Sequence, residues 1–214
     1  MPLPHETNSR ILPPEEDEDP TQLALMIEGK PYLSYDGYID KIRDKSAKKV
    51  WEINQIMDMV PRMDAMREFI YMGKEVWIVQ GFFCEYGFNI TLGDEVFIGA
   101  NCTLLDVGPI KIGSRTMLGP NVQILTPSHP ISPEERNGLK GKEWAKSVII
   151  GDDCWIGAGA TICPGVNIGN GSTIGASSVI TKNIPPRSIV VGNPGRIIKT
   201  IKEDGTTEPY TDPQ

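Results

Sequence analysis

The sequence has few of the residues that build metal centres and disulfide frameworks. It holds only two histidines, His5 and His129, and four cysteines, which form no CxxC pair. Two histidines are too few for a histidine-rich metal site. The cysteine spacing predicts free thiols in a reducing compartment and not a small domain held by disulfides. We therefore expect a cytoplasmic protein that requires no metal.

Long apolar runs and an excess of positive charge are also missing. No run of 18 apolar residues is present, and the start, MPLPHETNSR, lacks the basic-then-apolar order of a signal sequence. We therefore expect no membrane span and no targeting segment. The formal net charge of -7 argues against a nucleic-acid partner, because nucleic-acid binders normally present a basic face.

The charge is distributed unevenly along the chain. Residues 1–20 carry six acidic residues against one arginine, and the run PPEEDEDP predicts a disordered acidic tail over residues 1–19. Residues 181–202 hold five basic residues and no acidic residue. The C-terminal part of the chain is therefore compatible with an anionic small ligand.

Residues 20–75 are predicted to form a small helical unit, because their apolar residues recur at helical offsets among charged ones. The first helix is expected to end near Gly29 and the second to span 38–59. Pro61 interrupts the pattern, so a third, shorter helix is expected over 63–72. The apolar side of these helices is expected to pack on the rest of the chain.

A six-residue repeat runs through most of the remaining sequence. Aliphatic residues recur at this spacing in three runs: Leu92, Ile98, Leu104; Ile112, Leu118, Ile124; and Ile150, Ile156, Ile162, Ile168, Ile174, Ile180. Six is the period neither of a helix nor of a simple strand. A short strand followed by a tight turn, three times per coil, closes a triangular coil with one aliphatic side chain inside each side.

Twelve such positions make four coils with a continuous core. We predict a β-helix over residues 76–196, with an inserted loop at about 127–147 and a C-terminal tail over 197–214. The repeated isoleucines are structural on this interpretation and carry no chemistry. Function is expected on the loop that projects from the rigid coil.

The repeat and several longer segments resemble one enzyme family. The pattern [LIV]-Gly-x-x-[small]-x is similar to the left-handed β-helix of hexapeptide-repeat acyltransferases. Segments such as FFCEYGFNITLGDEVF, LGPNVQILTPSHPIS and IIGDDCWIGAGATICPGVNIG are similar to maltose and galactoside O-acetyltransferases. The resemblance covers roughly residues 22–201.

This resemblance implies a mainly β fold, a left-handed parallel β-helix with a small N-terminal α-helical cap. It implies transfer of an acetyl group from acetyl-CoA to a hydroxyl of a sugar or glycoside, in the manner of a maltose O-acetyltransferase. It also implies a homotrimer whose sites lie between subunits.

His129 is the expected catalytic residue. It is the only histidine of the folded region, stands in the loop that interrupts the repeat, and falls on the catalytic position of the family. The resemblance implies that its imidazole removes the acceptor hydroxyl proton while the hydroxyl oxygen attacks the acetyl carbonyl. A neutral imidazole suits this role at neutral pH. The thioester donor is reactive enough that no metal is needed.

The resemblance implies a set of acceptor-binding residues, of which this chain has only a part. Asp36 and Glu85 fall on positions that contact the acceptor in maltose-type enzymes, and Glu143 falls near another. The family has an asparagine where this chain has Gly99. Asn101 is a candidate to replace it, because residues two apart on a strand point the same way, but which donor replaces the asparagine is left open. The alternative for each carboxylate is a solvated surface position.

Coenzyme A is expected to bind along the C-terminal half of the β-helix. By the resemblance, the contacts are Trp155 beside the cofactor arm, the backbone of Ala158 and Ala176 at the pantetheine amides, and Thr181, Lys182, Arg196 and Lys199 at the adenosine phosphates. Basic side chains suit these phosphates by charge and donor geometry. The alternatives are an aromatic ring lying on the coil and a solvated basic surface.

Two other functions are weighed against this one. The same chemistry on a non-sugar or xenobiotic acceptor is one, and a non-catalytic β-helix used as an assembly module is the other. His129 and the basic C-terminal positions argue against the assembly module. A serine acetyltransferase is disfavoured because its long helical domain is missing, and a carbonic-anhydrase-like β-helix because it requires three histidine ligands.

Overall fold

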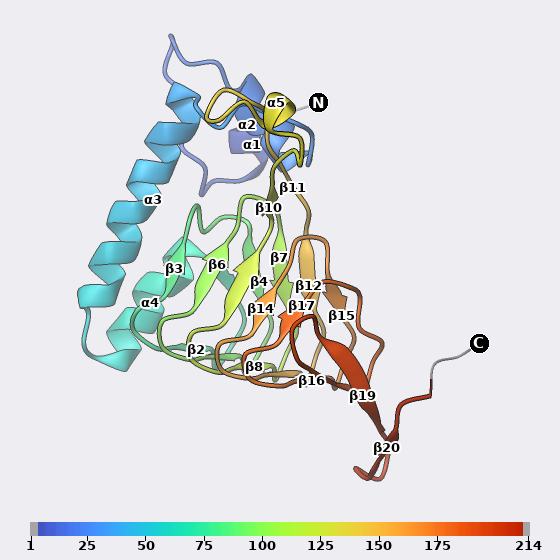
Figure 1. The fold of residues 1–214 in the computed structure, drawn as a ribbon. Coiled ribbons are helices and arrows are strands. Elements are labelled where there is room, and N and C mark those ends of the chain that lie inside the picture. The colour runs from blue at the N-terminus through green and yellow to red at the C-terminus, as the bar shows by residue number, and fades with distance from the viewer. Residues whose placement is uncertain (1–3, 212–214) are drawn as a thin grey trace.

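The aliphatic repeat forms the inside of a three-sided parallel β-helix in the computed structural model, which describes residues 4–211 (Figure 1). All twelve repeat positions are at most 3% exposed. Each coil hydrogen-bonds through its backbone to the coils before and after it, so the isoleucines stack into one continuous core. The expected mainly β fold is confirmed.

The three faces of the coil are short parallel sheets. The first contains β1 (Tyr71–Met72), β4 (Ile90–Leu92), β7 (Ile110–Ile112), β12 (Val148–Ile150) and β15 (Asn167–Ile168). The second contains β2 (Trp77–Ile78), β5 (Phe97–Ile98), β8 (Met117–Leu118), β13 (Trp155–Ile156), β16 (Thr173–Ile174) and β18 (Ser188–Val191). The third contains β3 (Phe83–Cys84), β6 (Thr103–Leu105), β9 (Gln123–Leu125), β14 (Thr161–Ile162) and β17 (Val179–Ile180).

The coil is longer than the four turns expected from the repeat. A first turn, β1 to β3, precedes Leu92, and its inward position on the third face is filled by buried Cys84. The step from Cys84 to Leu92 is eight residues, which hides this turn from a search for a period of six. The coil therefore begins at Tyr71, five residues before the expected boundary at 76.

Three helices form the cap, as expected, but the second ends four residues earlier than expected, and the third begins four and ends three residues earlier. They are α2 (Thr21–Ile27), α3 (Gly37–Gln55) and α4 (Met59–Phe69). Pro61 lies in the first turn of α4. The N–H groups of a first turn have no acceptor within the helix, so a proline there costs no hydrogen bond and does not separate the helices. The break comes at Ile56, where the backbone turns extended. Val50 and Met66 from α3 and α4 join the core at the open end of the coil.

The N-terminal segment is packed where the sequence predicted a disordered tail. It contains α1 (Pro4–Thr7), and Ile11 is 3% exposed in a second core cluster with residues of α2 and α3. Lys41 on α3 lies 2.5 Å from a carboxylate oxygen of Glu15 and 3.0 Å from one of Glu18. The expectation of disorder is wrong here because acidic residues find a basic partner on the cap. Residues 1–3 of the expected tail lie outside the described residues.

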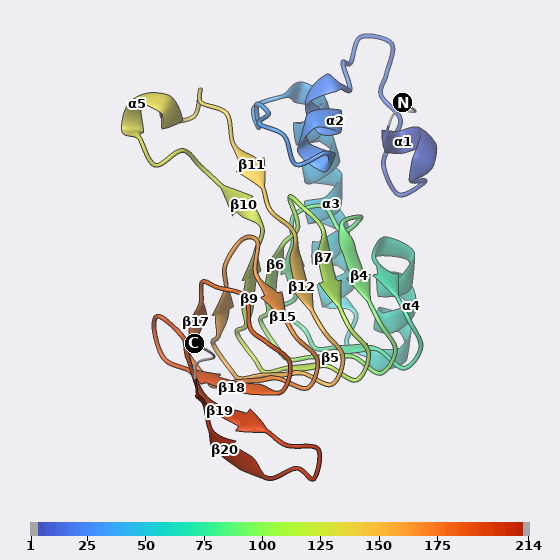
Figure 2. The ribbon, with the colours of Figure 1, turned by 90° about the vertical axis from the view of Figure 1, so that its right-hand side faces the viewer.

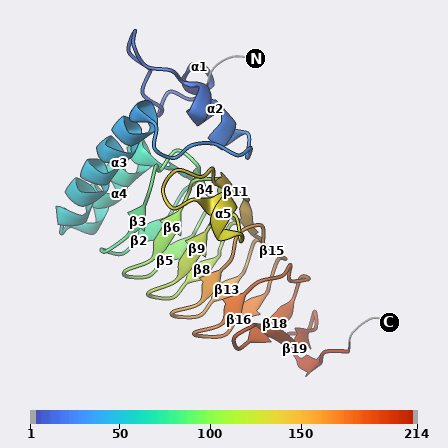
Figure 3. The ribbon, with the colours of Figure 1, turned by 45° about the horizontal axis from the view of Figure 1, so that its top comes forward.

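Two extensions leave the coil. The inserted loop forms an antiparallel hairpin, β10 (Pro127–Ser128) with β11 (Trp144–Ala145), and carries the short helix α5 (Pro133–Arg136) away from the coil (Figure 2). At the end opposite the cap, β19 (Arg196–Ile201) pairs antiparallel with β18, and β20 (Thr207–Pro209) pairs antiparallel with β19, which extends the second sheet (Figure 3). The expected C-terminal tail is therefore mostly sheet over its described part.

The four cysteines are all free, and three of them are buried. The cytoplasmic location expected from them stays a prediction. Within residues 4–211, none of the helices is both long and apolar enough to cross a membrane.

Candidate active site

His129 lies directly after β10, at the base of the projecting hairpin. The hairpin leaves the coil at Thr126, whose hydroxyl donates to the carbonyl of Leu105 (2.6 Å) and accepts from the N–H of Gly108 (2.9 Å). The His129 side chain is 56% exposed, and its Nε2 lies 3.6 Å from Oε2 of Glu143. This separation is too long for a hydrogen bond, so Nε2 of His129 is not hydrogen-bonded to the carboxylate.

Glu143 is fixed by a residue of the cap. The backbones of Tyr32 and Glu143 exchange two hydrogen bonds, at 2.9 and 3.0 Å, and the Tyr32 hydroxyl donates to Oε1 of Glu143. Burial and the neighbouring carboxylates raise the pKa of Tyr32, which keeps its hydroxyl protonated as a donor. The contact leaves the other carboxylate oxygen of Glu143 facing His129, and the predicted place of Glu143 near the acceptor stays a prediction.

Glu85 lies near enough to Glu143 for their charges to interact, and it pairs with Arg43 of α3. Oε1 of Glu85 lies 3.1 Å from Nε of Arg43, and Arg43 also donates to Asp40 (2.8 Å) and to the Tyr86 hydroxyl (3.2 Å). Burial raises the pKa of Glu85 to about 6, against the opposing effect of Arg43. Arg43 was missed by the sequence analysis, because nothing in a helical pattern marks one arginine among many charged residues.

Asp106 shapes the loop that carries Glu85. It is fully buried, and its carboxylate accepts three consecutive backbone N–H groups, those of Glu85 (2.9 Å), Tyr86 (2.9 Å) and Gly87 (2.7 Å). Burial raises the pKa of Asp106 to about 6, although these hydrogen bonds oppose the shift. The sequence analysis missed this residue too.

Asp36 and Asn101, both predicted to bind the acceptor, have structural roles in the fold. Asp36 is the N-cap of α3, and its carboxylate accepts the N–H of Ile39 (3.0 Å). Asn101 lies in a turn between β5 and β6 with φ of +57°, a conformation that asparagine tolerates well. The expectation that it points along a strand with residue 99 is therefore wrong. At Gly99 a Cβ would lie 2.7 Å from the backbone of Gly119 and Pro120, so the turn has no room for a side chain without a backbone shift.

The residues expected at the pantetheine arm lie on the second face of the coil and at its edge. Trp155 is 58% exposed on β13. Ala158 and Ala176 occupy the same corner in consecutive coils, where the N–H of Ser177 donates to the carbonyl of Ala158 (2.8 Å). Small side chains at this corner leave the backbone accessible along the coil.

The basic residues expected at the phosphates gather at the end of the coil opposite the cap. The N–H of Gly195 donates to Val179 (2.8 Å), which places the start of β19, with Arg196, beside β17 and the following Thr181 and Lys182. Lys199, also on β19, pairs with Ile189 of the neighbouring strand β18. Within residues 4–211 neither these two lysines nor Arg196 has a carboxylate partner.

The other two basic residues of this stretch have structural contacts. Arg187 donates to the backbone carbonyls of Ile201 and Lys202, and Lys202 forms an ion pair with Glu208 (2.8 Å). The positive charge left for a ligand therefore comes from the three residues that the sequence analysis selected.

A row of exposed apolar side chains on the second face was not expected. Trp77, Phe97, Met117 and Trp155 are paired in register on successive coils and are between 38% and 58% exposed. The period of six predicts their outward direction, but of these four residues only Trp155 was singled out from the sequence. Exposed aromatic and sulfur side chains in a continuous row are typical of a surface that is covered in the functional state.

Comparisons with known proteins show the family of the chain. Residues 89–126 match the family model described as the hexapeptide repeat of succinyl-transferase, and residues 147–182 match the bacterial transferase hexapeptide model. The galactoside O-acetyltransferase of Escherichia coli is 31% identical over 164 residues, which cover 76% of this chain and 80% of that protein.

Two solved structures are similar over nearly their whole length. A maltose O-acetyltransferase from Clostridium difficile is 41% identical, with a TM-score of 0.81 over 85% of this chain and 98% of the other. A hexapeptide-repeat acetyltransferase from Vibrio cholerae, solved with acetyl coenzyme A, is 33% identical, with a TM-score of 0.79 over 85% and 99% of the two chains. The chain belongs to the hexapeptide-repeat acetyltransferase family that includes the maltose and galactoside O-acetyltransferases.

Proposed function

We propose that this protein transfers the acetyl group of acetyl-CoA to a hydroxyl of a sugar or glycoside, with His129 as general base. The observation that carries the proposal is the position of this imidazole. It is exposed at the base of the hairpin, and its Nε2 faces a carboxylate at 3.6 Å without being hydrogen-bonded to it. Such a nitrogen is free to accept a proton, and the carboxylate stabilises the imidazolium that results.

The reaction proceeds by direct transfer between two bound substrates. His129 removes the acceptor hydroxyl proton as the oxygen attacks the acetyl carbonyl, and a C–O bond forms. The C–S bond then breaks, and the imidazolium returns the proton to the sulfur, which leaves as the CoA thiol. Holding both substrates in attack geometry contributes ~7–11 kcal/mol to the lowering of the barrier. A general base adds ~10²–10⁴ in rate.

The polar region between the cap and the hairpin supports a sugar as the acceptor. Glu85 and Glu143 offer carboxylate oxygens that accept hydrogen bonds from hydroxyl groups, and Arg43 offers donors beside them. A polyhydroxylated ligand satisfies both kinds of group, whereas an alcohol with one hydroxyl leaves buried polar groups unpaired. Asp36 and Asn101 are not included in this acceptor site, because each has a structural position elsewhere.

Coenzyme A is assigned to the second face of the coil and its end. Trp155 would lie against the cofactor arm, and the backbone at Ala158 and Ala176 would meet its amides. Lys182, Arg196 and Lys199, together with the hydroxyl of Thr181, would bind the phosphates. The exposed tryptophan and the three cations without carboxylate partners support this assignment.

A homotrimer with sites between subunits is part of the proposal. The row of Trp77, Phe97, Met117 and Trp155 gives each subunit an apolar surface to cover. Light scattering in solution should give a mass near three times 23.6 kDa. A monomer with full activity would contradict shared sites.

A thiol-release assay with acetyl-CoA tests the function. The acceptors are maltose, glucose, a galactoside, glucosamine and several simple alcohols. Release that saturates with a sugar or glycoside is expected. Release only with the simple alcohols would move the acceptor class away from sugars. No release together with no binding of CoA would favour a non-catalytic assembly module.

A further inference from the structure

A second cavity, separate from the site of His129, lies between the N-terminal segment, α3 and α4. Its volume is about 740 Å³, within the ~300–1,000 Å³ range of small-molecule sites. Tyr86 lines this cavity and also contacts Arg43 and Asp106 of the region around Glu85. The described acetyl-transfer site otherwise leaves this cavity unused.

The cavity is lined by an excess of positive charge. Its lining includes four basic residues, Arg10, Lys45, Lys48 and Lys49, and two acidic ones, Glu52 and Glu68. The side chains of the three lysines form no hydrogen bond or ion pair in the described part of the chain, unlike Lys41 one turn earlier on α3, which pairs with Glu15 and Glu18. The acidic N-terminal segment thus neutralises one lysine of α3 and leaves the three at the cavity uncompensated.

Arg10 is held rigidly at the rim of the cavity. Its guanidinium donates to the backbone carbonyls of Arg67, Glu68 and Ile70 at the end of α4, at 3.1 to 3.3 Å, and lies 3.6 Å from the centre of the Tyr71 ring. No carboxylate of the described chain pairs with it. A cation fixed in this way loses little conformational entropy when it binds an anion.

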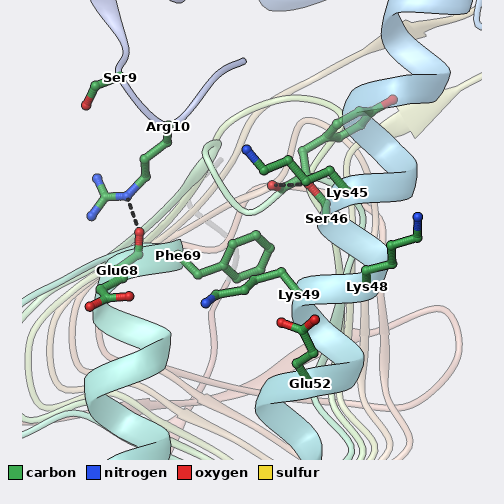
Figure 4. A pocket seen from close by; sticks show the side chains of 10 residues that line it. Ser9, Arg10, Lys45, Ser46, Lys48, Lys49, Glu52, Glu68 and Phe69 are labelled. Carbon is green, nitrogen blue, oxygen red and sulfur yellow. Dashed lines mark hydrogen bonds between the residues drawn. The ribbon is translucent and has the colours of Figure 1, made fainter.

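The floor of the cavity is aromatic. Figure 4 shows the Phe69 ring in the space between Arg10 and α3, with Lys45 and Lys49 extending from the helix toward that side and Lys48 pointing away. Gly87 lies close to the Phe69 ring, because an added Cβ there would lie 2.6 Å from it. The cavity thus combines a flat apolar surface with cations at its edge.

We propose that this cavity binds a small organic anion, with a flat apolar group against Phe69 and a phosphate or carboxylate group between Arg10, Lys45 and Lys49. The acetyl-transfer reaction does not require such a ligand. Arg10 belongs to the N-terminal segment that precedes α2, so this segment completes the site.

Binding of 1-naphthyl phosphate, measured by calorimetry on the full chain with CoA saturating the transferase site, tests the proposal. We expect saturable binding below about 5 mM in the wild-type protein. Lys45→Gln with Lys49→Gln should weaken it about tenfold, and rising salt should weaken it further. Lys74→Gln with Lys111→Gln removes the same charge at exposed positions elsewhere and should leave the affinity unchanged.

A third variant separates the apolar part from the charged part. Phe69→Leu should weaken 1-naphthyl phosphate several-fold and leave the weak binding of inorganic phosphate unchanged. Wild-type protein that shows no saturable binding, or equal affinity in the Lys45/Lys49 variant and its control, would overturn the proposal. So would a loss of oligomer mass confined to the Lys45/Lys49 variant, because the cavity would then be a subunit contact.

Discussion

At the scale of single residues, His129 is distinguished by an imidazole nitrogen, Nε2, that is not hydrogen-bonded to the nearby carboxylate. Its exposed imidazole lies 3.6 Å from Glu143, which Tyr32 fixes through its other carboxylate oxygen. His129→Ala should lower kcat by ~10²–10⁴, the usual contribution of a general base, and leave the affinity for acetyl-CoA unchanged. Thiol release and direct binding of CoA measure the two quantities.

The other histidine supplies the matched control. His5 lies in α1, and His5→Ala should leave kcat unchanged. Wild-type kcat in the His129→Ala protein would remove this residue from the mechanism.

Glu85 is predicted to act on the acceptor alone. Glu85→Gln removes the charge that faces Arg43 and replaces one acceptor oxygen by a donor. The KM of the sugar should rise about tenfold, the cost of one charged hydrogen bond, while the KM of acetyl-CoA stays the same. Glu95→Gln, at an exposed turn, is the control. Equal changes in both KM values would show a general loss of structure.

Asp106 gives the protein a pH-dependent term in its stability. A carboxyl whose pKa rises from about 4 in the unfolded chain to about 6 in the folded one binds its proton more tightly when folded. Its contribution to the free energy of unfolding is therefore present at low pH and is lost as the pH rises from about 4 to about 6. The change is up to about 3 kcal/mol for two pKa units.

Denaturant unfolding at several pH values tests this term. The free energy of unfolding of the wild-type protein minus that of Asp106→Asn should decrease between about pH 4 and pH 7. An increase over that range would mean that the three backbone donors outweigh burial and that the pKa is lowered.

At the scale of elements, the coil depends on close contact between its turns. A Cβ on Gly119 would lie 2.7 Å from the backbone nitrogen of Ala158 in the next coil, whereas nothing lies within 4 Å of one on Gly37 at the start of α3. Gly119→Ala should lower the free energy of unfolding by ~1–3 kcal/mol. Gly37→Ala should keep or raise it, because alanine favours the helix. Thermal unfolding of both variants checks the difference, and equal stability would contradict the close stacking.

The same elements show how far the sequence alone can predict this protein. The period of six identified the twelve stacked aliphatic residues from Leu92 to Ile180, because a buried residue at a fixed spacing leaves a regular trace. Other buried aliphatic residues of the coil, such as Val96, Ile110 and Val148, lie outside that spacing. The first coil was not predicted, because its inward residue Cys84 is not aliphatic and lies eight residues before Leu92, which interrupts the period of six. The start of α4 was misplaced because a proline in a first helical turn looks the same in sequence as one that ends a helix.

At the site, contacts between segments that are distant in the sequence limit what the sequence alone can predict. His129 and Glu143 were predicted by resemblance, and the hairpin brings them together. The pairing of Glu143 with Tyr32 spans 111 residues, and that of Glu85 with Asp106 spans 21. No local pattern records such pairs. The role of Asn101 was predicted from strand alternation, which fails where the chain turns.

At the scale of the whole molecule, the coil is a rigid support for three separate parts. The cap supplies Tyr32 and Arg43, the hairpin supplies His129 and Glu143, and the far end supplies the basic residues of β19 (Figure 3). In the proposed trimer, the hairpin of one subunit and the coil surface of its neighbour would enclose acetyl-CoA between them.

A structure of the assembled protein with bound CoA tests the central claim most directly. The account predicts that the His129 ring lies within hydrogen-bond reach of the CoA sulfur, or one bridging water away from it. A ring farther from the sulfur than that, in every pair of neighbouring subunits, would contradict it.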